Sequence, residues 1–118
     1  ALCRRARWAH PDDLFVRLYA ARGWLSRGRF LQACDELESF RERVPDDWRG
    51  RWAAELAGIH ATAGFEASSD RWLGVAESAV DAASAVCLYS RACALADRQR
   101  WGAAVELGAR KWRNPLSQ

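Results

Sequence analysis

The side chains with the greatest potential for chemistry are two histidines, four cysteines and a pair of adjacent aspartates. His10 lies close before Asp12 and Asp13, so these three residues can be imagined as nitrogen and oxygen ligands of a metal ion. The aspartates follow Pro11 directly, and acids at that point suit the start of a helix, where they accept hydrogen bonds from unpaired amides. We therefore predict a helix cap here and no metal site.

The four cysteines are Cys3, Cys34, Cys87 and Cys93, and they form no C-x-x-C pair. Neither histidine stands at a zinc-ligand spacing from them. Their neighbours are mainly Ala, Leu and Val, which is typical of small buried thiols in a reducing compartment. These features predict structural cysteines and a cytoplasmic location.

Motifs for catalysis are missing from the sequence. The 8 glycines are scattered and build no phosphate-binding loop, and neither G-x-S-x-G nor H-E-x-x-H occurs. No acid is placed to orient His60 as a general base. We expect no enzyme activity, no catalytic residue and no cofactor.

The charge of the chain does not favour a nucleic-acid partner. The net charge is +3, with 18 basic residues against 15 acidic ones, and every basic residue except Lys111 is arginine. The cluster "RRAR" at residues 4–7 lacks a recognition-helix pattern, so it would supply only nonspecific attraction to phosphates. No apolar run approaches the ~18 residues of a membrane span. We predict no direct nucleic-acid partner and no membrane partner.

Size and composition fit one folded domain. The chain has 118 residues, and 50% of them are hydrophobic, which is enough for a core. It opens at Ala1 and contains no methionine, so we expect a piece of a longer protein. The mixed charges of "DELESFRER", residues 35–43, predict a solvated face. Core positions are expected for five of the seven tryptophans, Trp24, Trp48, Trp52, Trp72 and Trp101; the other two, Trp8 and Trp112, lie near the ends.

The elements that position these side chains are predicted to be helices. After the start signal at Pro11, apolar residues recur at steps of three and four, as on one face of a helix; they are Leu14, Leu18, Ala21 and Leu25. The segment "SRGR" ends that helix, with Gly28 able to adopt the left-handed backbone. A second stripe then runs from Phe30 to Val44, and Pro45 ends it.

This pattern repeats along the chain. "PDDL" at residues 11–14 returns as "PDDW" at 45–48, a shift of 34 residues. A shift of 70, about twice that period, places Tyr19 on Tyr89, Glu36 on Glu106 and Pro45 on Pro115. We predict one domain, 1–118, built from helical hairpins with units at about 11–44, 45–80 and 81–115.

The junction between the second and third units allows two readings. Residues 71–96 contain no proline and only Gly74, so they can form one long helix, which gives five helices in all. Alternatively, Asp81 caps a new helix and gives six. We favour six.

A period near 34, a helix pair per unit and a proline after the second helix resemble the tetratricopeptide repeat. In that family the second helix carries a small residue followed four residues later by a bulky apolar one. Ala33 with Leu37, and Ala103 with Leu107, match this pattern, whereas the small position of the first helix falls on Ala21 and on Arg91. The resemblance implies an all-α fold of antiparallel hairpins stacked as a short α-solenoid.

The same resemblance implies a protein- or peptide-binding scaffold, because the first helices of such units line a concave face. By that register, Phe15, Arg22 and Ser26 face the peptide, and Arg51 is a possible addition. Arginines at these positions favour an acidic peptide or a terminal carboxylate as the partner.

An alternative function follows from residues 71–116. This segment resembles the Ala/Arg-rich helical arrays of large ATP-dependent LuxR/MalT-type transcriptional regulators. The chain would then be a sensor or coupling segment between an ATPase module and a DNA-reading domain. The sequence that follows Gln118 in the parent protein discriminates between the two functions.

Overall fold

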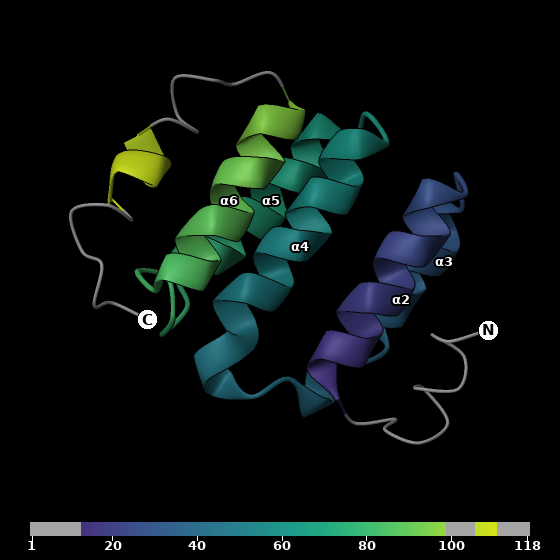
Figure 1. Ribbon diagram of the computed structural model, residues 1–118, viewed down its shortest axis with the longest axis horizontal. Helices are drawn as coiled ribbons and strands as arrows, with labels where there is room; N and C mark the ends of the chain where they lie inside the picture. The colour runs from purple at the N-terminus through teal and green to yellow at the C-terminus, as the bar shows by residue number, and fades with distance from the viewer. Residues whose placement is uncertain (1–12, 99–105, 111–118) are drawn as a thin grey trace. The chain divides into compact units, whose positions relative to one another are not determined.

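The computed structural model describes residues 13–98 and 106–110, which contain helices, turns and short connections and no β-strand (Figure 1). The predicted all-α fold class is confirmed. The elements in chain order are α2 (Leu14–Ser26), α3 (Phe30–Glu38), η1 (Arg41–Arg43), η2 (Asp46–Trp48), α4 (Arg49–Thr62), α5 (Glu66–Glu77) and α6 (Ala85–Asp97). Residues 106–110 are also helical.

Two compact units make up the chain, and the boundary between them falls between Val44 and Pro45. The first unit contains α2, α3 and η1, and the second contains η2, α4, α5 and α6. The division into three repeat units within one domain, and the stacking of hairpins into a solenoid, stay predictions.

The first unit is an antiparallel pair of helices, α2 and α3 (Figure 1). Asp13 caps α2 by accepting a hydrogen bond from the backbone N–H of Phe15 at 2.9 Å, which confirms the predicted cap. The helix ends where Gly28 adopts a φ of 73°, also as predicted. The N–H of Gly28 donates to the carbonyl of Leu25 at 2.9 Å. This tight turn brings α3 back along α2 and buries side chains between them; Leu18, Ala21, Ala33 and Leu37 are among those buried.

The helix α3 is shorter than predicted. The apolar stripe from Phe30 to Val44 indicated one helix, but α3 ends at Glu38 and a short 3-10 helix, η1, follows. Proline disfavours a helical conformation in the residue before it, and Val44 is extended with ψ of 121°. Phe40 and Val44 are still buried, so the stripe identified core residues correctly although it misplaced the end of the helix.

In the second unit, α4 packs against both α5 and α6 (Figure 1). Trp52 of α4 is 1% exposed, and its ring meets the edge of Trp72 with centroids 5.3 Å apart. A cluster of buried side chains joins the three helices to residues 106–110; its members are Ala57, Leu73, Leu88, Ala94, Leu95 and Leu107. Arg98 ties the end of α6 to α5 by pairing with Asp70.

The turn between α4 and α5 repeats the turn of the first unit. Gly64 adopts a φ of 88°, and the N–H of Phe65 donates to the carbonyl of His60 at 2.9 Å. In the first unit, the N–H of Arg29 donates to the carbonyl of Trp24 at 2.9 Å in the same way. Both hairpins therefore turn through a left-handed glycine.

The segment from 71 to 96 is broken into two helices, α5 and α6, as the favoured reading predicted. The predicted role of Asp81 as the cap of the new helix is wrong, because α6 begins after Ser84, whose hydroxyl accepts from the N–H of Cys87 at 3.1 Å. Asp81 caps α4 instead. Its carboxylate accepts from the N–H groups of Gly50 at 2.6 Å and Arg51 at 3.1 Å.

The prediction that the cysteines are buried is confirmed for two of them and wrong for a third. Cys34 and Cys87 are buried, as predicted, whereas Cys93 is exposed on α6 and the prediction is wrong there. Cys93 lies one helical turn after Tyr89, which is also exposed, so the two side chains share one face of α6. Cys3 lies outside the described residues.

Burial raises the pKa of the Cys34 thiol to about 11, and the charge of Glu38 adds to the shift. Burial also raises the pKa of Cys87 to about 11, with a further rise from Asp81 and a fall from Arg91. We expect iodoacetamide at pH 8 to alkylate Cys93 at least ~10-fold faster than Cys34 or Cys87, because buried thiols are protonated and inaccessible. Mass spectrometry of the alkylated peptides measures the three rates, and equal rates would contradict the burial of these thiols.

The same shifts give a pH dependence of stability. Both folded-state pKa values lie above the 9.0 of an ordinary thiol, so these thiols favour the folded state below pH 9. That contribution is lost as the pH rises from 9 to about 11. The free energy of unfolding should fall over this range, and less steeply in a variant with both cysteines replaced by alanine.

Candidate functional site

The outward side of α2 carries a row of exposed side chains. Phe15, Tyr19, Arg22 and Ser26 stand at positions i, i+4, i+7 and i+11, which places them on one face of the helix. Phe15 is 49% exposed and Tyr19 is 67% exposed, and Arg22 and Ser26 are exposed as well. We call these four residues the α2 outer face.

The exposure of this face follows from the way α2 packs. The buried side chains Leu14, Leu18 and Ala21 lie on a different side of the same helix. An amphipathic helix normally places charged and polar residues away from its buried side. Here two large aromatic side chains occupy that side instead, and about half or more of the surface of each stays exposed.

Three of the four predicted site residues, Phe15, Arg22 and Ser26, therefore lie together on the α2 outer face. The Ser26 hydroxyl donates to the carbonyl of Gly23 at 2.9 Å, within its own helix. Tyr19 was not predicted as a site residue, although its position one turn after Phe15 could have identified it. It also recurs as Tyr89, which is 58% exposed on α6.

The fourth predicted residue, Arg51, belongs to the second unit and is half-buried on α4. Its Nε lies 4.0 Å from a carboxylate oxygen of Glu55, and its guanidinium lies 5.8 Å from the centre of the Trp48 ring. Glu55 also accepts a hydrogen bond from the hydroxyl of Ser90 at 3.3 Å. Arg51 thus already faces a carboxylate of its own unit.

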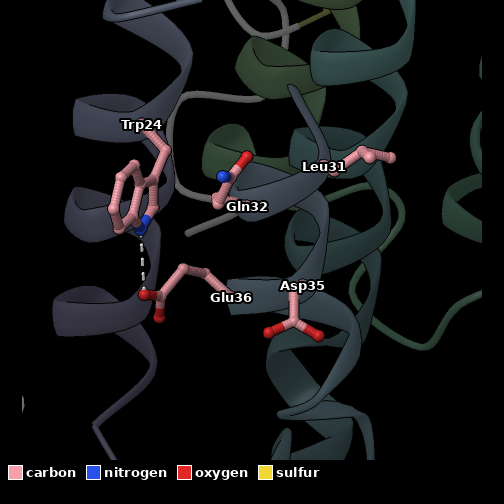
Figure 2. A pocket seen from close by; sticks show the side chains of 5 residues that line it. All are labelled: Trp24, Leu31, Gln32, Asp35 and Glu36. Atoms are coloured by element: carbon pink, nitrogen blue, oxygen red, sulfur yellow. Dashed lines mark hydrogen bonds between the residues drawn. The ribbon is translucent and has the colours of Figure 1, made fainter. Parts of the chain in front are cut away.

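A second feature of the first unit is a hollow between α2 and α3, with a volume of about 440 Å³. Figure 2 shows its lining: one residue comes from α2, Trp24, and four come from α3, Leu31, Gln32, Asp35 and Glu36. We call this the α2–α3 hollow. Gln32 and Glu36 stand on the side of α3 that faces Trp24, and Leu31 and Asp35 stand further around the helix (Figure 2).

Glu36 is the buried polar residue among those that line this hollow. It is 5% exposed, and its two carboxylate oxygens accept hydrogen bonds from Trp24 Nε1 and from Arg17 Nη1, each at 3.2 Å. The prediction of a solvated face for residues 35–43 is wrong at this position. The one signal in the sequence was the recurrence of Glu36 as Glu106, but Glu106 is exposed.

Two other features, a metal site and a membrane-spanning helix, are both absent from residues 13–98 and 106–110. No three side chains of His, Cys, Asp or Glu gather there as potential metal ligands. None of the helices in these ranges combines the length and the apolar character needed to cross a membrane. His10, Asp12 and the "RRAR" cluster lie outside the described residues.

Comparison with known proteins gives no family for this chain: no family model matches it, and neither does any curated protein or solved structure.

Proposed function

We propose that this chain is a protein- or peptide-binding helical module that contacts its partner through the α2 outer face. The observation that carries the proposal is the exposure of two aromatic side chains, Phe15 and Tyr19, beside Arg22 on one face. Exposed apolar groups of this kind are typical of interaction sites. Tyrosine and arginine are also enriched among the residues that contribute most to binding energy.

The proposed partner is an acidic segment or a terminal carboxylate. Arg22 presents a planar guanidinium that can bind a carboxylate through two parallel hydrogen bonds. Phe15 and Tyr19 offer area for apolar side chains of the same segment. Arg51 contributes less than the sequence indicated, because Glu55 already lies against it.

A selection from a random peptide library displayed on phage tests this proposal. The unaltered chain should enrich peptides that combine acidic and apolar residues. Replacing Tyr19 with alanine should weaken the selected peptides at least ~30-fold, as expected for loss of an aromatic anchor. Replacing Arg22 with glutamate should remove the preference for acidic residues.

The matched control is Tyr89→Ala, which removes from α6 a tyrosine that is 58% exposed, against 67% for Tyr19. This variant should bind the selected peptides as the unaltered chain does. If Tyr89→Ala weakened binding as much as Tyr19→Ala, or if no peptide were enriched, the α2 outer face would not be the contact surface.

The alternative, a sensor or coupling segment of a transcriptional regulator, has one observation in its favour. The chain forms two compact units, and rotation of one rigid body against another is one way in which a segment relays a state between domains. A helix-turn-helix after Gln118 in the parent chain would support this function. Further helical hairpins there would support the scaffold instead. Both functions are compatible with a cytoplasmic location.

A further inference from the structure

The α2–α3 hollow carries negative charge that its own residues do not balance. Two of its five lining residues are carboxylates, Asp35 and Glu36, and none is basic. Glu36 is compensated by Arg17, whereas the exposed Asp35 forms no ion pair with any residue in the described ranges. The amide of Gln32 likewise has no hydrogen-bond partner among those residues. The hollow therefore offers an uncompensated carboxylate and an amide to a cationic group.

The aromatic wall of the hollow is held in a fixed orientation. The indole N–H of Trp24 donates to Glu36, and Arg17 holds the other oxygen of the same buried carboxylate. These two contacts fix the position of the ring, and the dashed line in Figure 2 marks the one between Trp24 and Glu36. A ring fixed before binding does not lose side-chain freedom when a ligand arrives.

The same ring already accepts a guanidinium. Arg27, the residue that follows the end of α2, places its guanidinium carbon 5.6 Å from the centre of the Trp24 ring. Guanidinium groups prefer tryptophan among aromatic partners, because the face of the indole is the most electron-rich. Arg27 does not line the hollow, so the contact shows which chemistry the indole accepts without filling the space.

From these observations we propose that the α2–α3 hollow binds an arginine side chain from a basic segment of a partner protein. The guanidinium lies against the Trp24 ring and pairs with the carboxylate of Asp35, and the amide oxygen of Gln32 accepts a further hydrogen bond. Leu31, which is 78% exposed, adds apolar surface at the rim of the hollow. Lysine fits less well, because its ammonium is more strongly hydrated and cannot stack on the ring.

This contact is separate from the α2 outer face. Trp24 is two positions beyond Arg22, and two helical steps of about 100° place it on nearly the opposite side of α2. The inference goes beyond the proposed function and does not depend on it. One partner that uses both surfaces would carry acidic and basic segments that flank α2.

The test is a titration with the blocked tripeptide acetyl-Gly-Arg-Gly-amide, followed by the NMR signal of the Trp24 indole N–H. Comparison with Trp24→Phe assigns that signal among the tryptophans. We expect saturable shifts with a dissociation constant in the ~millimolar range that a single side chain supplies. The same peptide with citrulline, which keeps the shape and lacks the charge, should bind at least ~10-fold more weakly, and the lysine peptide about 3-fold more weakly.

Two variants with equal charge changes locate the site. Asp35→Asn should weaken the arginine peptide about 10-fold, because it removes the pairing carboxylate. Glu38→Gln removes the same charge one turn away, outside the hollow, and should change the affinity less than about 2-fold. Both side chains are exposed, so neither variant is expected to unfold the chain.

Three results would overturn the proposal. The first is citrulline binding as well as arginine, and the second is Glu38→Gln acting as strongly as Asp35→Asn. The third is binding seen only after Arg4, Arg5 and Arg7 are replaced by alanine, which would make the chain's own basic segment the occupant. Tyr19→Ala should leave this titration unchanged, so failure of the α2 outer face and failure of the hollow are distinguishable.

Discussion

Replacing Glu36 with alanine is expected to lower the free energy of unfolding by about 3 kcal/mol, the typical cost of removing one partner from a buried ion pair. The loss leaves Arg17, whose side chain is 17% exposed, without the carboxylate that it faces. It also leaves the indole N–H of Trp24 without its acceptor. Both donors then carry the cost of unsatisfied polar groups. Urea denaturation followed by tryptophan fluorescence measures the change.

Glu38→Ala is the matched control for this prediction, because Glu38 lies on the same helix and is exposed. It should change the free energy of unfolding by less than about 0.5 kcal/mol. Glu36→Gln keeps the shape and one acceptor, and should fall between the two. Equal effects of Glu36→Ala and Glu38→Ala would show that the buried contacts of Glu36 contribute nothing to stability.

The features that were predictable from the sequence are those that neighbouring residues determine. Asp13 caps α2 through an N–H two residues away, and the Gly28 turn is closed by carbonyls a few residues earlier. The apolar steps of three and four predicted the buried side of α2 for the same reason. Such local interactions are present in any fold that contains the helix, so they can be derived without knowing the fold.

The features that were missed depend on residues far apart in the chain. Asp81 caps α4 through the N–H of Gly50, 31 residues earlier in the chain, and Glu36 pairs with Arg17 across 19 residues. The pattern around Glu36 is a mixture of charges with no sign that one of them is buried. The carboxylate becomes a core group only because α3 folds back on α2 and brings Trp24 and Arg17 to it.

The two candidate surfaces differ in the same respect: one follows from local periodicity, and the other depends on residues of two packed helices. The spacing of Phe15, Arg22 and Ser26 follows from helical periodicity, and the structure places all three on the α2 outer face. The α2–α3 hollow could not be predicted, because its lining comes from two helices whose relative positions are set by their packing. Trp24 was assigned to the core from its apolar neighbours, and it is half-buried at the edge of a cavity.

Replacing Gly50 with alanine is expected to lower the free energy of unfolding by about 2 kcal/mol, as overpacking and loss of a helix cap outweigh the gain in helix propensity. A Cβ atom at this position would lie 2.6 Å from a carboxylate oxygen of Asp81 and 3.0 Å from the Cys87 sulfur. The nearest of these atoms belongs to the carboxylate that caps α4. To make room, Asp81 must move away from the N–H groups of Gly50 and Arg51. The N-terminus of α4 then loses these two hydrogen bonds, and it also loses a favourable negative charge.

Gly58→Ala tests the same substitution on the same helix without the close approach. A Cβ atom there would meet Asp97 at 3.8 Å, an ordinary contact. This variant should raise the free energy of unfolding by up to about 1 kcal/mol through helix propensity alone. A double-mutant cycle then identifies the mechanism: if Gly50→Ala acts by displacing Asp81, it should cost much less in a chain that already carries Asp81→Ala. The same cost in both backgrounds would place the effect on Cys87 rather than on the cap, since the sulfur is the other atom that the new methyl group meets.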